Sequence, residues 1–573
     1  MKFARLAEYF LELEKTASRL KMTEILASLF KEAQKTEIDK IIYLSQERLV
    51  PAFVKLEFGV SDKLTAKAIA RASGEKEEKI HQLYKKLGDY GLVGEQVVSW
   101  RGKGLMVLEV YEELYKVASA SGEGAVEKKL TLLSQLLQKL SPIEVRYVLR
   151  IPLGKLRLGI GDPTILDALS YAYAGDKSFR EPLERAYNLC SDLGEVAKVL
   201  FTKGKSGIEK FEVEVGKPIR MALAERLSSA EEILKKIGPC LVEAKYDGFR
   251  CQVHRDKDEV KIFSRNLEET TQMFPEIVEG ARRQIREKKA ILEGEAIAYN
   301  PDTGEYLPFQ ITVQRKRKYG IEEMKKRFPL QLFAFDLLYA EDEDLTQKPL
   351  KERRKILEEI IKKGEILKPS DARAVKTEKE LNTIFEESIS EGLEGIMAKR
   401  WDSPYQAGAR NFNWIKLKRS YKGALTDTVD LVLVGYLVGR GARAAFGIGS
   451  LLGAVYDKKE ERFKTVAKIG SGLSEEEWVE MKKRLDKIKI QNKPKDLDAL
   501  LVPDIWVEPK YVVEVMADEI TKSPVHTCGK TDGSGYALRF PRVLHFREDR
   551  KPEDATTVNE ILKMYKMQRK AKA

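Results

Sequence analysis

The stretch Val242-Glu-Ala-Lys-Tyr-Asp-Gly-Phe-Arg250 places a lysine between two carboxylates. Alternate side chains of a β-strand point to opposite faces, so Glu243, Lys245 and Asp247 share one face if the stretch is extended. Gly248 permits a tight turn, and the alternation that continues after it predicts a hairpin carrying the lysine. A lysine that loses its proton near phosphates and a metal ion is a nucleophile. Taken alone, however, this pattern favours a solvated strand edge with ordinary salt bridges.

Further short motifs follow this lysine along the chain. They are Ser264-Arg-Asn266, Leu292-Glu-Gly-Glu295, Phe333-Ala-Phe-Asp336, Glu394-Gly-Ile-Met-Ala-Lys399, Trp414-Ile-Lys-Leu-Lys418 and Arg539-Phe-Pro-Arg542. Their order and spacing resemble the motif set of the covalent nucleotidyltransferases, and most closely that of the ATP-dependent DNA ligases of the archaeal and eukaryotic replicative type. The resemblance runs from about residue 110 to the C-terminus, and as a set it is highly specific.

The composition limits the class of protein. The 573 residues exceed what one hydrophobic core accommodates, so about three or four domains are expected. A net charge of +12 favours a polyanionic partner. The four cysteines form no C-x-x-C pair, which argues against a structural zinc site. The N-terminus lacks a signal-like apolar core and no apolar run reaches membrane-spanning length, so we expect a cytoplasmic or nucleoid-associated protein without a membrane partner.

Periodicity divides the chain into three regions. Residues 1–215 carry apolar side chains at helical spacing, as at Leu133 and Leu137, and predict an all-α domain. Residues 216–420 alternate strands and helices and predict an α+β domain. Residues 421–573 turn mostly to strands, which fits a β-barrel of the OB fold with a basic C-terminal helix. The resemblance implies the same multi-domain fold: an all-α DNA-binding domain, an α+β nucleotidyltransferase domain and an OB-fold domain.

Individual elements are predicted in the second and third regions. The expected strands are 260–264, 290–299, 330–339, 395–399, 429–438, 449–456, 463–469, 506–517 and 536–546. The expected helices are 268–288, 351–362, 378–390 and 474–487. Ser474 and Glu477 make a capping box at the start of the last of these helices.

Charged and aromatic side chains of the motifs are candidates for nucleotide contacts. The resemblance implies that Lys245 is the catalytic nucleophile, that ATP is bound by Glu243, Arg250, Arg265, Glu295, Phe335, Arg410, Lys416 and Lys418, and that Mg²⁺ is bound by Glu295 and Glu394. Arginine suits phosphate because its planar fork binds bidentately. Mg²⁺ takes one or two carboxylates with phosphates and water. Without the resemblance, the acids read as surface residues, Phe335 as a core residue and the lysines as a solvated basic face.

The resemblance also implies a three-step reaction that seals nicks in DNA during replication, repair and recombination. Lys245 attacks the α-phosphate of ATP, pyrophosphate leaves, and AMP stays bonded to the lysine. AMP then passes to the 5′-phosphate of a nick, and the 3′-hydroxyl displaces it. We expect neighbouring Arg and Lys side chains, with Mg²⁺, to lower the pKa of Lys245. Basic residues in Arg539-Phe-Pro-Arg542 and Arg547-Glu-Asp-Arg550 are expected to orient pyrophosphate as the third domain closes on the pocket.

One turn in the helical region is a candidate for DNA contacts. Leu153-Gly-Lys-Leu-Arg-Leu-Gly-Ile-Gly-Asp162 is rich in glycine beside Lys155 and Arg157, and such turns bring N–H groups and positive charge to phosphates. A helix–helix turn with solvated charges explains the spacing equally well. The resemblance implies nicked double-stranded DNA as the partner, and it places this turn in an all-helical domain that grips the minor groove around the nick. A sliding clamp is a further partner expected from the family alone, and a monomer is expected.

Three other functions are considered. An RNA ligase or capping guanylyltransferase does not need the helical N-terminal third. An NAD⁺-dependent ligase carries a four-cysteine zinc module, which the scattered cysteines here exclude. A catalytically inactive DNA-binding scaffold would not need all the charged motif residues together. Two positions depart from the family pattern: Met221 stands where proline is common, and Arg550 stands where lysine is usual.

Overall fold

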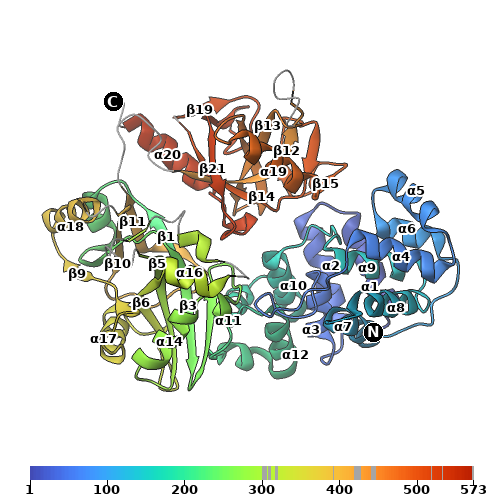
Figure 1. The fold of residues 1–573 in the computed structure, drawn as a ribbon, viewed down its shortest axis with the longest axis horizontal. Coiled ribbons are helices and arrows are strands. Elements are labelled where there is room, and N and C mark those ends of the chain that lie inside the picture. The colour runs from blue at the N-terminus through green and yellow to red at the C-terminus, as the bar shows by residue number, and fades with distance from the viewer. Residues whose placement is uncertain are drawn as a thin grey trace.

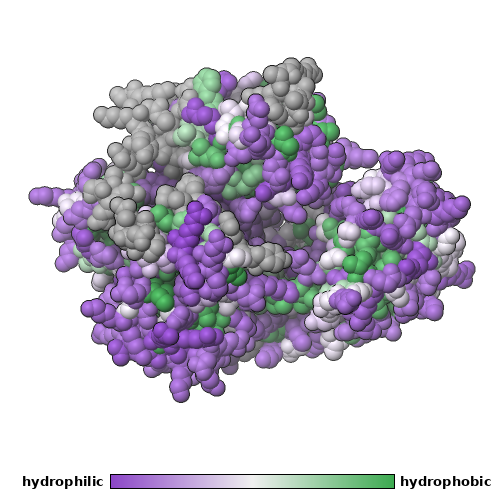
Figure 2. Space-filling view, viewed as in Figure 1, coloured by the Kyte–Doolittle hydropathy of each residue, from purple (hydrophilic) through white to green (hydrophobic). Residues whose placement is uncertain are grey.

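The computed structural model describes residues 1–299, 306–307, 312–316, 320–390, 393–418, 428–439, 447–517, 519–531 and 533–570. Figure 1 shows a helical region in blue and teal, a mixed region in green and yellow, and a strand-rich region in orange and red. The face drawn in Figure 2 is mostly hydrophilic, with small separate apolar patches. Within the described residues, no helix has both the length and the apolar character needed to cross a membrane.

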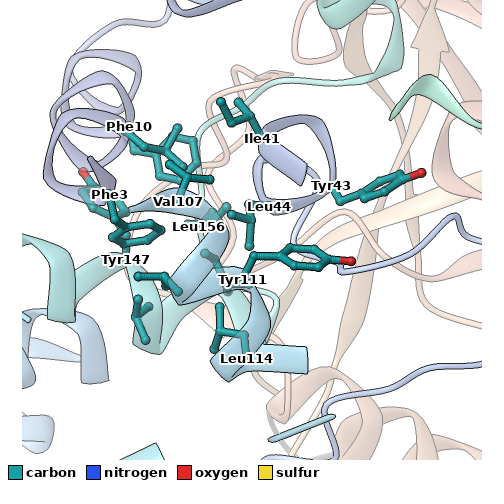
Figure 3. Close-up of a cluster of buried hydrophobic side chains, with 14 of the residues drawn as sticks. Phe3, Phe10, Ile41, Tyr43, Leu44, Val107, Tyr111, Leu114, Tyr147 and Leu156 are labelled. Atoms are coloured by element: carbon teal, nitrogen blue, oxygen red, sulfur yellow. The ribbon is translucent and has the colours of Figure 1, made fainter. Parts of the chain in front are cut away.

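The first region is all helical, as its periodicity predicts. Its helices are α1 (Phe3–Glu14), α2 (Arg19–Glu32), α3 (Ile38–Ser45), α4 (Asp62–Ser73), α5 (Glu77–Leu87), α6 (Tyr90–Val97), α7 (Val107–Ser119), α8 (Ala125–Leu137), α9 (Pro142–Leu153), α10 (Asp162–Ala174), α11 (Arg180–Cys190) and α12 (Leu193–Glu209). They pack around one hydrophobic core, part of which Figure 3 shows, with Phe10, Leu44 and Tyr147 among its labelled side chains. Ser141 and Glu144 form a capping box that starts α9, because each side chain accepts an end N–H group.

The mixed region contains two sheets. Its elements are β1 (Leu223–Arg226), α13 (Ala230–Ile237), β2 (Cys240–Ala244), β3 (Phe249–Asp256), β4 (Glu259–Ser264), η1 (Thr271–Met273), α14 (Pro275–Gln284), β5 (Lys289–Ala298), η2 (Val313–Arg315), α16 (Ile321–Arg327), β6 (Leu330–Ala340), β7 (Glu343–Asp344), α17 (Leu350–Ile360), β8 (Leu367–Pro369), β9 (Ala372–Val375), α18 (Glu378–Ser390), β10 (Gly395–Arg400) and β11 (Arg410–Lys418). One sheet has the order β1-β11-β10-β2-β9, and the other has β4-β3-β5-β6-β7 with β8 beside β6.

The hairpin predicted around Lys245 is wrong. Strand β2 ends at Ala244 and pairs with β9 and β10, whereas β3 begins at Phe249 and pairs with β4 and β5 in the other sheet. The four residues between the strands therefore cross from one sheet to the other. Strands β4, β5, β6 and β10 lie within one residue of their predicted limits, and α18 has the predicted limits. The helix predicted at 268–288 is shorter, since α14 starts only at Pro275, a residue suited to a first helical turn.

The third region is rich in strands. Its elements are β12 (Val429–Leu437), β13 (Ser450–Asp457), β14 (Arg462–Ile469), α19 (Glu475–Asp486), β15 (Lys489–Ile490), β16 (Leu497–Asp498), β17 (Ile505–Val507), β18 (Val512–Met516), β19 (Glu519–Ser523), β20 (Gly535–Arg539), β21 (Arg542–Phe546), η4 (Pro552–Asp554) and α20 (Val558–Lys570). The main sheet has the order β15-β17-β12-β13-β14-β16, and β18 joins β12 to β21. Pairing among these described strands gives an open sheet, so a closed OB barrel stays a prediction. The capping box at Ser474 is confirmed.

Two strands predicted as continuous are interrupted. The run 506–517 splits into β17 and β18 around Pro509, and the run 536–546 splits into β20 and β21 before Pro541. Proline has no backbone N–H to donate to a neighbouring strand, which favours a break at each point. The domain boundary near 215 stays a prediction, and the one at 420 lies outside the described residues.

Candidate active site

A cleft of about 760 Å³ is lined by the mixed region and by the strand-rich region. All the nucleotide and metal contacts predicted from the sequence line it: Glu243, Lys245, Arg250, Arg265, Glu295, Phe335, Glu394, Arg410, Lys416 and Lys418. The strand-rich region contributes Arg547, Arg550 and Glu560 to the same lining. The fold thus gathers motif residues that are far apart in the sequence. Arg539 and Arg542 are absent from the described lining of this cleft.

Lys245 lies at the crossing between the two sheets. Its backbone N–H donates to the carbonyl of Gly395 at 2.9 Å, which fixes it at the end of β2. Its ammonium group forms an ion pair with Glu394, and its side chain is 21% exposed. Burial disfavours the charge, but the carboxylates of Glu394 and Asp247 outweigh it and raise the pKa of Lys245. The lowering of this pKa by neighbouring cations together with Mg²⁺ stays a prediction, since the nearest charged group to the Lys245 ammonium here is the carboxylate of Glu394.

Glu394 is held between two lysines. Its carboxylate also pairs with Lys418 at 3.1 Å. Burial opposes its ionisation, but the two ammonium groups hold its pKa well below the ordinary value. The next residue, Gly395, has φ +147°, and an added Cβ would lie 2.1 Å from the carbonyl oxygen of Leu417. Glycine is therefore required for β10 to approach β11 closely enough to bring Glu394 to Lys418.

Glu295 is a second carboxylate at the cleft. It lies opposite Arg250 in the pairing of β5 with β3, and it accepts the backbone N–H of Gly248 at 3.2 Å. Gly248 is needed here for close approach, since an added Cβ would lie 2.3 Å from the carbonyl of Ala296. Burial raises the pKa of Glu295 to about 7, although Lys245 and Arg250 partly offset it. A buried carboxylate short of positive charge suits a bound cation.

Aromatic rings form one wall of the cleft. Phe335 meets Trp414 edge-on with ring centroids 5.8 Å apart. The ammonium group of Lys399 lies 4.4 Å from each centroid and donates to Glu243 at 2.8 Å. Glu243 is only 3% exposed and also accepts from Arg354 at 3.4 Å. The structure therefore places Glu243 in a buried ion-pair network that contributes to the lining of the cleft.

A second group of cleft-lining residues, here called the basic wall, consists of Arg265, Arg410, Lys416 and Lys418. Burial holds the pKa of Lys416 well below its ordinary value, and the positive charge of Lys418 lowers it further. Burial, together with the smaller effect of the positive charge of Arg550, lowers the pKa of Arg265 to about 10. Arg410 forms an ion pair with Glu560 of α20. Burial and neighbouring cations thus disfavour the charge of Lys416 and of Arg265, so an anionic ligand such as a nucleotide phosphate would stabilise both side chains.

The basic residues of the strand-rich region are paired with acids. Arg547 donates to both oxygens of Asp549 at 2.8 Å, and Arg550 pairs with Asp430 at 2.5 Å. Sequence reasoning missed Asp430 and Glu560, because no local pattern marks an acid that meets a base from another part of the chain.

The glycine-rich turn of the helical region lies away from this cleft. Lys155 pairs with Asp62 at 3.2 Å, and Arg157 lies 3.8 Å from Glu508 of the strand-rich region. Arg19 of α2 also donates to the carbonyl of Glu461 at 2.6 Å. The helical and strand-rich regions are therefore in direct polar contact beside the turn.

Comparisons with known proteins cover the chain almost from end to end. Three family models match: DNA ligase N terminus over residues 2–170, ATP dependent DNA ligase domain over 221–418, and ATP dependent DNA ligase C terminal region over 444–550. A probable DNA ligase of Dictyoglomus turgidum is 55% identical, with 100% of this chain and 99% of its own covered. A DNA ligase of Sulfurisphaera tokodaii is 47% identical, with 100% and 98% covered. A solved mycobacterial DNA ligase D complexed with ATP and MES is 24% identical over 59% of this chain and 98% of that chain, with a TM-score of 0.35.

Proposed function

This chain belongs to the ATP-dependent DNA ligases, enzymes that seal nicks in DNA through an adenylate intermediate, and we propose how its residues divide that work. The observation that carries the proposal is that Lys245, two carboxylates, two aromatic rings and the basic wall line the same cleft. These are the groups that a lysyl-AMP reaction needs: a nucleophile, a platform for the base and cations for the phosphates.

Lys245 is the nucleophile in this proposal. Its neutral amine attacks the α-phosphorus, a nitrogen–phosphorus bond forms, and the bond to the pyrophosphate oxygen breaks as the amine proton leaves. The ion pair with Glu394 keeps the amine protonated. Glu394 releases Lys245 when its carboxylate turns to a cation or to the nucleotide, and burial then favours the neutral amine. The pair therefore restrains the nucleophile until the substrates are in place.

Glu295 and Glu394 are the proposed magnesium ligands. Both are cleft carboxylates, and the raised pKa of Glu295 indicates a site short of positive charge. Within the described residues, no group of three or more His, Cys, Asp or Glu side chains could hold a metal. That suits Mg²⁺, which commonly takes one or two protein carboxylates and completes its shell with phosphates and water. When bound, the ion neutralises phosphate charge and favours the transfer.

The remaining cleft residues bind the nucleotide in this proposal. Phe335 stacks on the adenine, and Glu243, which Lys399 links to the Phe335 ring, contacts the nucleotide beside it. Arg250 contacts the ribose or phosphates. Phosphate oxygens are held by Arg265, Arg410, Lys416 and Lys418. Burial disfavours the charge of Arg265, Lys416 and Lys418, so an anionic ligand would stabilise these side chains.

Domain motion would bring DNA to the adenylated lysine. We infer that the strand-rich region is an OB-type barrel that closes on the cleft, because Arg547 and Arg550 already line it. The helical region would hold nicked duplex DNA through the turn that carries Arg157, and the contact of that residue with Glu508 must then break. A sliding-clamp partner and a monomeric state stay predictions.

Nick sealing tests the proposal. The full chain is incubated with ATP, Mg²⁺ and a duplex carrying one nick, and the joined strand is measured. A second substrate with RNA at the nick separates DNA ligation from RNA ligation. Removal of residues 1–210 is expected to leave self-adenylation largely intact and to cripple sealing, because the helical region has its own core. Normal sealing by the truncated chain would refute the role assigned to the helical region.

A further inference from the structure

A buried hydrogen-bond network lies directly behind Arg250. Its guanidinium donates from Nη2 to Glu293 at 2.7 Å and from Nη1 to the carbonyl of Ala222 at 2.6 Å. Tyr405 donates its hydroxyl to the same carboxylate oxygen of Glu293 at 2.9 Å, and Gln252 donates to the other oxygen at 3.1 Å. Glu293 is 0% exposed, so these donors are what satisfies its charge. The carboxylate that holds Arg250 is itself held on both oxygens.

Tyr405 has a second contact that fixes it in place. Its hydroxyl oxygen accepts the backbone N–H of Ala222 at 2.8 Å, while the Ala222 carbonyl accepts from Arg250. The hydroxyl and the guanidinium thus clamp one peptide segment from two sides. Burial raises the pKa of Tyr405 well above its ordinary value, so the phenol stays a hydrogen-bond donor.

Arg250 differs from a buried structural arginine of the same region. Arg353 and Asp336 form an ion pair in which both side chains are 0% exposed. The side chain of Arg250 is 16% exposed and lines the cleft, with its guanidinium 5.4 Å from the ring of Phe335 and 5.1 Å from that of Trp414. One edge of Arg250 is therefore bound by the network, and another part of the side chain faces the nucleotide site.

We propose that Glu293 and Tyr405 are positioning residues that hold Arg250 in the orientation needed for enzyme adenylation. Neither needs to touch ATP, because both act through the guanidinium. An arginine side chain has many rotamers, and fixing one of them before ATP binds removes an entropy cost from the reaction. This inference rests on the nucleotide contact assigned to Arg250 in the proposed function.

A double-mutant cycle tests the inference. Single-turnover self-adenylation is measured at varied ATP for the wild type, Tyr405→Phe, Arg250→Ala and the double variant, which yields the saturating rate and the half-saturating ATP concentration. In the presence of Arg250, Tyr405→Phe is expected to lower the saturating rate divided by the half-saturating ATP concentration about tenfold, as loss of a hydrogen bond to a charged group does. In the Arg250→Ala background the same change is expected to cost less than about twofold, because its target is gone. Glu293→Gln is measured alongside, and Tyr405→Phe carries the test if that variant does not fold.

Glu276→Gln is the matched control. It weakens another buried ion pair of the mixed region, with Arg315 at 2.7 Å, away from the cleft lining. Its melting temperature is expected to fall while its adenylation stays unchanged. Equal losses for Tyr405→Phe with and without Arg250 would overturn the inference, since the effect would then be structural. Unchanged adenylation in Arg250→Ala itself would instead overturn the nucleotide contact of Arg250, and the inference would fall with it.

Discussion

Glu394 and Lys245 form an ion pair inside the cleft, and this pair leaves the proposed nucleophile protonated. The same carboxylate is bound by Lys418, so Glu394 links the nucleophile to the basic wall. The pH dependence of adenylation follows from this relationship.

The self-adenylation rate of the wild type is expected to rise with pH across the whole range from about 6 to 10. The raised pKa of Lys245 lies above this range, and below a pKa the neutral fraction increases tenfold for each unit of pH. Glu394→Gln removes the main charge that raises this pKa, so the rise is expected to level off at a lower pH even though the maximal rate falls. Single-turnover rates at limiting Mg²⁺ and ATP measure both profiles, because limiting concentrations report the ionisation of the free enzyme, in which Glu394 still pairs with Lys245. If the profile of Glu394→Gln moved to higher pH instead, the proposal that Glu394 keeps Lys245 protonated would be contradicted.

Magnesium dependence is expected to report the ionisation of Glu295. Burial raises the pKa of Glu295 to about 7, so below that pH the carboxyl is protonated and is a poor cation ligand. The Mg²⁺ concentration for half-maximal adenylation should therefore increase as the pH falls from about 8 to 6. In Glu295→Gln this concentration should be high at both pH values. If the wild type needed the same Mg²⁺ concentration for half-maximal adenylation at both pH values, Glu295 would not be a ligand of the ion.

Gly395→Ala is expected to unfold the site locally. The added methyl would lie 2.1 Å from the carbonyl of Leu417 at a φ of +147°, so β10 must shift away from β11. Strain of this kind costs about 1–3 kcal/mol, and the displaced Glu394 and Lys418 should also reduce adenylation. Thermal unfolding and adenylation are measured together. Gly74→Ala, whose added Cβ has nothing within 4 Å at a φ of +73°, controls for backbone strain without a clash.

DNA binding is expected to weaken steeply with salt, because phosphate contacts release counterions. Arg157→Ala should lower the affinity for nicked duplex and reduce the slope of log affinity against log salt by about 1, without changing self-adenylation. Arg157→Lys keeps the charge and should retain most of the slope. Binding titrations at several salt concentrations decide. An unchanged slope in Arg157→Ala would place the phosphate contacts elsewhere.

Much of the site could be predicted from short motifs, but its pairings could not. The residues of the cleft are found because each motif is local, as with Glu295 or Lys418. The ion pair of Lys245 with Glu394 could not be predicted in this way, because it depends on the pairing of β2 with β10, two strands far apart in the chain. For the same reason a turn at Gly248 looks like a hairpin, although the flanking strands join different sheets. The interrupted strands were predictable, since Pro509 marks one break.

The most direct test of the account is to locate the covalent AMP. The full chain is mixed with Mg²⁺ and ATP labelled on the α-phosphate, denatured, digested and mapped, with Lys245→Ala alongside. The account predicts label on the peptide that contains Lys245 and none on the variant. Label on another residue, or label retained by Lys245→Ala, would contradict the assignment of the nucleophile.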